Sequence, residues 1–220
     1  MVDYLILIVV TLVIGLASTG LVRHAMNKYS TVPSSRQITG AQAASQMLRY
    51  NGVYDVALNR GGADDDFFDP KSNAVTLSSR SFSKTSVTAI AIAYHEVGHA
   101  CQHAQGYVPL KFRSAIYPVV NFASNAWFYL LIIGVFLGLS GMILLGVFMY
   151  AFVVLFELAT LPVEFNASRR ALQYMQSIAL PKEEIAMARK VLIACALTYV
   201  AAALTSVLQL LWLLSRHNDQ

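Results

Sequence analysis

Three residues have the types and spacing of a metal-dependent hydrolytic site: His95, Glu96 and His99, in the pattern His-Glu-x-x-His. The surrounding sequence predicts a helix over about 84–105. The two histidines then project from one helix face, about 6 Å apart along the axis. Both imidazoles can bind one Zn²⁺ at about 2.0–2.1 Å. Glu96 lies beside the open coordination position, where it can act as the catalytic base toward an attacking water.

The residues around this pattern argue against a solvated helix turn that carries two histidines by chance. Most side chains over 87–101 are apolar, so the helix is expected to be buried. Three ionisable groups in a buried helix are costly unless they are paired or bind a metal ion. Metal binding is therefore favoured over the alternative, in which the histidines are buried in the core and make only hydrogen bonds.

The composition predicts a membrane protein. Of the 220 residues, 56% are hydrophobic and 13% are charged, whereas soluble domains average about 25% charged residues. The net charge is +4, but the basic residues do not cluster as on a nucleic-acid-binding surface, so no nucleic-acid partner is expected. The two cysteines, Cys101 and Cys195, indicate neither a disulfide framework nor a cysteine-based zinc site.

Long uncharged runs predict four transmembrane helices. The run 114–156 contains no charged residue, and as one helix it would extend about 65 Å, twice the hydrocarbon core of about 30 Å. Glycine and serine at 138–141 favour a break there. Asp3 rather than a basic residue precedes the first run, which favours a retained anchor over a cleaved signal peptide. The predicted spans are 4–22, 122–138, 141–161 and 191–214.

Four spans place both termini on one side of the membrane and the polar segments 23–118 and 162–190 on the other. These segments carry ten and five Lys and Arg residues, and only Arg216 lies on the opposite side. The positive-inside rule then places the polar segments in the cytoplasm and both termini outside the cell membrane. The expected fold is a mainly α membrane protein: four transmembrane helices with a small α+β, zincin-like cytoplasmic domain.

A third protein ligand is expected, because a catalytic zinc has three protein ligands and an open position. His103 continues the four-residue spacing, but it would lie about 12 Å from His95 along the helix. We therefore expect it beside the site or on the surface. Gln105 stands where a metzincin would have its third histidine. Glu164 is the predicted ligand, since the two spans after His99 return the chain to the same face of the membrane.

Two alternatives to this third ligand remain open. Glu164 could instead pair with Arg169 or Arg170 at the membrane interface. Glu157, deeper in the third span, would then be the alternative ligand. The predicted ligand set remains the two histidines and Glu164, which is a gluzincin arrangement.

Six stretches of the sequence carry a family resemblance. They are 66–71, 93–100 (Ala-Tyr-His-Glu-Val-Gly-His-Ala), 102–103, 106–110, 161–172 and 196–203. On these residues the chain resembles the YugP-like neutral zinc metallopeptidases of bacterial membranes, over nearly its whole length. The resemblance implies a membrane-embedded metalloprotease.

The order of parts is also similar to that of the HtpX and CAAX-type membrane proteases. Those proteins place a membrane hairpin between His-Glu-x-x-His and a ligand glutamate in a Glu-x-x-Ala-Asp pattern. Glu164 and Ala167 match this pattern, but Ser168 stands where the aspartate would be. That aspartate would help to orient a ligand histidine, so Asn166 or another polar group is expected to take this role.

Local patterns before the motif predict a small α+β unit. Thr39 and Gln42 form the capping box of a helix, and 53–58 and 74–78 are strand candidates. We expect Val75–Leu77 to be an edge strand that binds an extended substrate by main-chain hydrogen bonds.

The sequence therefore predicts a zinc endopeptidase that acts on protein or peptide substrates, themselves membrane-associated, at the cytoplasmic side of the lipid bilayer. Glu96 deprotonates the attacking water and then protonates the leaving amine. The candidates to assist the oxyanion are Tyr107, Tyr174, Arg169 and Arg170. The alternatives are a metal-stabilised scaffold without catalytic activity and a hydrolase of a non-peptide amide. A general base argues against the scaffold, because a structural zinc needs none.

Overall fold

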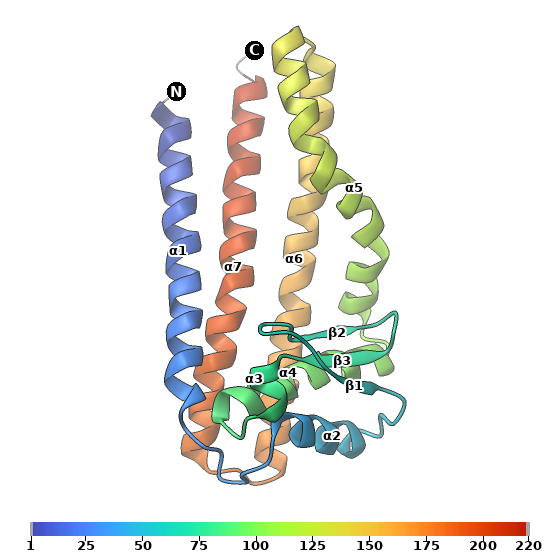
Figure 1. Ribbon diagram of the computed structural model, residues 1–220. Coiled ribbons are helices and arrows are strands. Elements are labelled where there is room, and N and C mark those ends of the chain that lie inside the picture. Colours follow the sequence, from blue (N-terminus) through green and yellow to red (C-terminus); the bar gives the residue numbers. More distant parts are fainter. Residues whose placement is uncertain (1, 219–220) are drawn as a thin grey trace.

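Four long helices run the length of the molecule, and a small sheet-containing segment lies at one end (Figure 1). The computed structural model describes residues 2–218. The long helices are α1 (Val2–Ser30), α5 (Val108–Leu137), α6 (Ser140–Ser177) and α7 (Lys182–Asn218). Each is long and apolar enough to cross a membrane. This confirms the prediction of a mainly helical membrane protein with four candidate transmembrane helices.

α1 and α7 pack side by side, and α1 begins at the end of the molecule where α7 ends (Figure 1). Asp3 Oδ2 and Arg216 Nη2 form an ion pair of 2.9 Å, and the rings of Tyr4 and Trp212 lie 4.5 Å apart. Most aliphatic side chains of α1 are exposed. An apolar surface of this extent is suited to lipid rather than to water.

α5 and α6 form a tight helical hairpin. Gly138 ends α5 with φ at 67°, a left-handed conformation that glycine adopts without steric cost. Within α5, Pro118 lacks the backbone N–H that a helix interior requires, and the helix is bent along its length (Figure 1).

α6 continues through Pro162 to Ser177, whereas the predicted third span ends at 161. Helices α4, α5 and α7 all pack against α6, and this packing offsets the hydrogen bond that Pro162 cannot donate. Glu164 therefore lies on a continuous helix rather than at the start of a separate segment.

The segment between α1 and α5 contains three helices and three strands. They are α2 (Gly40–Tyr50), β1 (Ala57–Arg60), β2 (Phe67–Asp69), β3 (Ala74–Leu77), α3 (Ser79–Ser83) and α4 (Val87–Ala104). The predicted capping box is present: Thr39 Oγ1 accepts a hydrogen bond from the Gln42 amide, and Gln42 Oε1 accepts one from the Thr39 amide. Helix α2 and strand β3 lie where the sequence patterns predicted a helix and the strand 74–78.

The sheet has the strand order β1-β3-β2, with β1 parallel and β2 antiparallel to β3. The prediction that Val75–Leu77 is an edge strand is therefore wrong, because β3 has a partner on both sides. Alternation along a strand reports its buried face and not its neighbours. The first strand also begins at Ala57 rather than 53, because Val53 packs into the core and donates its amide to the Leu48 carbonyl.

α4 lies at the centre of the hydrophobic core. Side chains from α2, β3, α6 and α7 pack around it, and every residue from Val87 to Gln102 is buried. The helix that carries the His-Glu-x-x-His residues is thus fixed on all sides by tertiary contacts.

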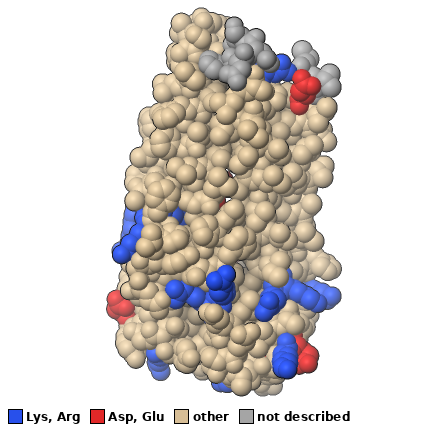
Figure 2. All heavy atoms as spheres, turned by 180° about the vertical axis from the view of Figure 1, so that it is seen from behind, with Lys and Arg blue, Asp and Glu red and all other residues tan. Residues whose placement is uncertain are grey.

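Charged side chains are distributed unevenly along the molecule. Figure 2 shows Lys and Arg gathered toward the end that carries the sheet, below a broad uncharged surface over the long helices. This distribution is expected for a protein whose long helices lie in lipid and whose sheet end lies in water.

Candidate metal centre

α4 positions the three residues of the motif. Ser86 caps the helix by accepting a hydrogen bond from the Ala89 amide. Buried apolar neighbours occupy the helix on both sides of the motif. His95 and His99 are consequently held one turn apart on a helix that cannot rotate toward solvent.

A glycine within the motif lets α4 approach α6 closely. A Cβ atom on Gly98 would lie 2.7 Å from the Ala167 carbonyl oxygen and 3.0 Å from its Cα atom. A larger residue would therefore displace the backbone of α6. The close approach brings Glu164, one turn before Ala167, against the two histidines.

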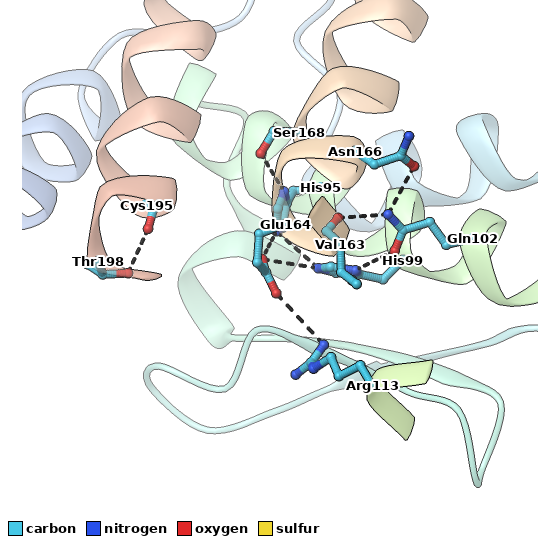
Figure 3. A network of polar contacts seen from close by, with 10 residues as sticks. All are labelled: His95, His99, Gln102, Arg113, Val163, Glu164, Asn166, Ser168, Cys195 and Thr198. Atoms are coloured by element: carbon cyan, nitrogen blue, oxygen red, sulfur yellow. Dashed lines mark hydrogen bonds and ion pairs between the residues drawn. The ribbon is translucent and has the colours of Figure 1, made fainter. Parts of the chain in front are cut away.

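His95, His99 and Glu164 converge in one buried cluster (Figure 3). His95 Nε2 lies 3.2 Å from Glu164 Oε2 and 3.2 Å from His99 Nε2. His99 Nε2 lies 3.5 Å from the same carboxylate oxygen. The exposed fractions are 8%, 9% and 3%, respectively. Two helices that are distant in sequence thus bring three potential metal-ligand atoms within 4.8 Å of one another.

The other ring nitrogen of each histidine contacts a neutral side chain (Figure 3). Ser168 Oγ lies 3.1 Å from His95 Nδ1, and Gln102 Oε1 lies 3.1 Å from His99 Nδ1. Ser168 therefore takes the orienting position that an aspartate would have in the Glu-x-x-Ala-Asp pattern. Asn166, the other candidate for that role, contacts Gln102 instead.

Gln102 determines which nitrogen of His99 faces the cluster. Gln102 is fully buried, and its Nε2 donates to the Val163 carbonyl at 2.7 Å and to Asn166 Oδ1 at 3.0 Å. A carbonyl only accepts, so the amide nitrogen must face it and Oε1 must face His99. His99 Nδ1 then carries the proton, and the lone pair of its Nε2 is free for a metal ion.

Replacing Gln102 with alanine should weaken zinc binding about 10- to 100-fold, because His99 loses the acceptor that fixes its tautomer. Zinc affinity is measured by competition with a chromophoric chelator. Gln105→Ala, at the exposed end of the same helix, is the matched control and should bind zinc as the wild type does. Equal affinities in the two variants would contradict this role of Gln102.

Burial and charge act in opposition on the ionisable groups of α4. Burial raises the pKa of the Glu96 carboxyl above its usual value, and the neighbouring histidines offset only part of this effect. Burial lowers the pKa of His99, but its contact with Glu164 and the charge of Glu96 outweigh the burial, so the net pKa is raised. The carboxylates of Glu96 and Glu164 thus favour a positive charge at the cluster, either on His99 or on a bound cation.

The donor set fits zinc. Two imidazole nitrogens and one carboxylate oxygen are a ligand set of catalytic zinc sites, in which a fourth position stays open. The carboxylates that raise the pKa of His99 would equally favour a bound cation. The cluster contains no thiol, so a site of cysteine-rich, structural type does not fit.

The cluster borders a cleft of about 750 Å³, whose wall includes Glu96, His99 and Glu164. Strand β2 forms another part of this wall. Tyr107, Arg113 and Tyr199 are among the wall residues that carry hydrogen-bond donors. These side chains can donate to negative charge that develops on a substrate in the cleft.

Three of the four oxyanion candidates from the sequence lie outside the cleft. Tyr174 is buried, and its ring packs 4.9 Å from that of Tyr94. Arg170 donates hydrogen bonds to two side chains outside the cleft, and Arg169 lines a separate groove between α6 and α7. Tyr107 is the one candidate of the four that borders the cleft.

The structure supports neither of the two alternatives to Glu164 as third ligand, nor a ligand role for His103. Glu157 is not part of the cluster. The arginine that pairs with Glu164 is Arg113, at 3.9 Å, and neither Arg169 nor Arg170 does so. His103 lies on the cleft wall against Phe68, with ring centroids 5.6 Å apart, and does not reach the cluster.

Sequence reasoning missed Gln102, Arg113 and Tyr199. Gln102 follows His99 by three positions, so helical spacing could have indicated their contact. Tyr199 is a polar residue within an apolar span, which is a functional signal. Arg113 is the last charged residue before the uncharged run, but nothing local indicates that it faces Glu164.

Comparison with known proteins agrees with this geometry. Residues 4–218 match the family described as "Putative neutral zinc metallopeptidase". The chain is also 45% identical over 192 residues to "Putative membrane protease YugP" of Bacillus subtilis (strain 168), covering 86% of this chain and 85% of that protein. No solved structure shows significant similarity. The family match over residues 4–218 includes the residues of the cluster, and the chain therefore belongs to this neutral zinc metallopeptidase family.

Proposed function

We propose that this chain is a zinc-dependent endopeptidase of the cell membrane, with an active site that opens to the cytoplasm. The observation that carries the proposal is the buried cluster of His95, His99 and Glu164 at the wall of a cleft that also contains Glu96. A structural metal site would need no cleft and no adjacent carboxylate.

Each group in the cluster has a separate role. His95, His99 and Glu164 would hold zinc, which supplies Lewis-acid activation of water and of the scissile carbonyl when it is bound. Glu96 accepts a proton from the attacking water on its carboxylate and delivers it to the leaving amine.

The free edge of β2 supports an extended peptide as substrate. β2 is a terminal strand of the sheet, and Phe67, Phe68 and Asp69 all line the cleft. A substrate strand can add to such an edge through main-chain hydrogen bonds, which tolerate many side chains. In this proposal β2 replaces Val75–Leu77 as the substrate-binding strand, and the substrates are unfolded or membrane-associated segments of proteins.

The distribution of basic residues supports the orientation. Fifteen of the sixteen Lys and Arg residues belong to the predicted cytoplasmic segments 23–118 and 162–190, and the sixteenth is Arg216. The short segment 162–190 is the stronger indicator, because the positive-inside rule applies best to short loops.

Cleavage in oriented membrane vesicles tests activity and orientation together. Inverted vesicles that contain the full chain should cleave added unfolded, fluorescently quenched casein, and sealed right-side-out vesicles should not. Detergent should make the two equal, a zinc chelator should stop cleavage, and added zinc should restore it. Vesicles without the chain provide the background.

The possible failures of this experiment are distinguishable. Cleavage confined to sealed right-side-out vesicles would overturn the cytoplasmic orientation and leave the peptidase activity standing. Cleavage that is absent after detergent treatment, or that persists with the chelator, would overturn the zinc peptidase assignment itself.

A further inference from the structure

A second hollow lies between the C-terminal half of α6 and the N-terminal half of α7. This α6–α7 groove, formed by residues within Phe165–Gln176 and Arg189–Val200, has a volume of about 410 Å³. It shares no lining residue with the metal cleft. Along α7 the groove crosses residue 191, the predicted start of the fourth span, whereas its α6 wall belongs to the predicted cytoplasmic segment 162–190. The groove therefore lies at the predicted membrane boundary.

One part of the groove is lined by long polar side chains. Arg169, Gln173, Gln176 and Arg189 are all exposed there, and none of the acidic residues that the structure describes lines the groove. Within residues 2–218, neither arginine forms an ion pair. Two guanidinium groups without a protein counter-charge can bind an anion with several acceptor oxygens.

The rest of the groove is apolar. Phe165, Ile193 and Leu197 line it and are 46%, 52% and 40% exposed. Because α6 and α7 run antiparallel (Figure 1), Phe165 and Val200 lie at the membrane-side end, farthest from Gln176 and Arg189. A water-soluble anion would leave this apolar wall uncovered.

We propose that the α6–α7 groove binds an anionic phospholipid. Its headgroup lies between Arg169 and Arg189, and one acyl chain follows the apolar wall toward Val200. The groove lies at the predicted membrane boundary, where a phospholipid headgroup would be. The basic side chains at this end of the molecule (Figure 2) complement the negative charge of an anionic bilayer surface.

The proposed lipid lies close to the metal cluster. Ser168 lines the groove and also lies 3.1 Å from His95 Nδ1. One side chain therefore separates the lipid from a residue of the cluster. The lipid site does not depend on the proposed peptidase activity, so its test requires no substrate.

Lipid binding to the detergent-purified full chain tests this inference by native mass spectrometry. Phosphatidylglycerol, phosphatidylcholine and inorganic phosphate are the three probes. We expect tight binding of phosphatidylglycerol alone, and about tenfold weaker binding in Arg169→Gln/Arg189→Gln. Lys182→Gln/Lys190→Gln is the matched control: it removes the same charge from exposed positions of α7 outside the groove, and should bind as the wild type does.

Three results would overturn the proposal. Equal weakening in the lysine control would indicate general surface attraction rather than a site. Inorganic phosphate that competes with phosphatidylglycerol at equal concentration would indicate an anion site without lipid selectivity. Unchanged phosphatidylglycerol binding in the arginine variant would show that the lipid does not occupy this groove.

Discussion

Replacing Glu96 with glutamine should lower peptide cleavage about 10²- to 10⁴-fold while one zinc per chain stays bound. Glutamine keeps the shape of the side chain but cannot accept a proton from the attacking water. Glu96 is not one of the three clustered ligand residues, so the metal remains. The measurement is the initial rate of casein cleavage together with zinc content by mass spectrometry.

The control for this change is Glu183→Gln. Glu183 is exposed in the first turn of α7 and does not line the cleft, so the variant loses the same charge outside the site and should keep full activity. Full activity in Glu96→Gln would contradict the assigned base. It would also revive the alternative of a metal-stabilised scaffold, for which this substitution should have no effect.

Replacing Glu164 with alanine should remove both zinc and activity. The carboxylate lies within 3.5 Å of both histidines, and its loss leaves two ligands. Loss of an outer hydrogen-bond partner alone weakens metal binding about 10- to 100-fold, so loss of a ligand should exceed about 100-fold. Chelator competition measures the affinity, and casein cleavage measures the activity.

Glu157→Ala is the matched control, because Glu157 lies on the same helix two turns earlier and outside the cluster. It should keep its zinc. Zinc loss in Glu157→Ala with zinc retained in Glu164→Ala would exchange the roles of the two residues and contradict the α4–α6 geometry described above.

The three residues of the metal cluster could be predicted from patterns within the sequence itself. The pair His95 and His99 depends only on helical periodicity. Glu164 depends on the hairpin between it and the motif, since an uncharged run too long for one span implies two crossings. These inferences are local or topological, and they need no knowledge of side-chain packing.

The surroundings of the cluster could not be predicted in the same way. The order of the strands depends on which earlier segments pair with β3. The alternation of residues within one strand does not indicate its partners. Arg113 and Tyr199 reach the cleft because α5 and α7 pack at particular rotations around α6. Tyr174 was a reasonable donor by sequence, but the same packing turns it toward Tyr94.

The role of Ser168 could be predicted only in part. Sequence comparison with a Glu-x-x-Ala-Asp pattern identified the position but suggested that the orienting function had moved elsewhere. The hydroxyl nevertheless reaches His95 Nδ1 at 3.1 Å. Helical geometry explains this, because residues 164 and 168 lie on the same face of α6 one turn apart.

The most direct test of the proposed zinc site is zinc K-edge X-ray absorption on the purified full chain. We expect one zinc per chain, with nitrogen and oxygen neighbours at about 2.0–2.1 Å and two imidazole ligands. A sulfur neighbour at about 2.3 Å, or a chain that binds no zinc when zinc is supplied, would contradict the proposed zinc site at His95, His99 and Glu164.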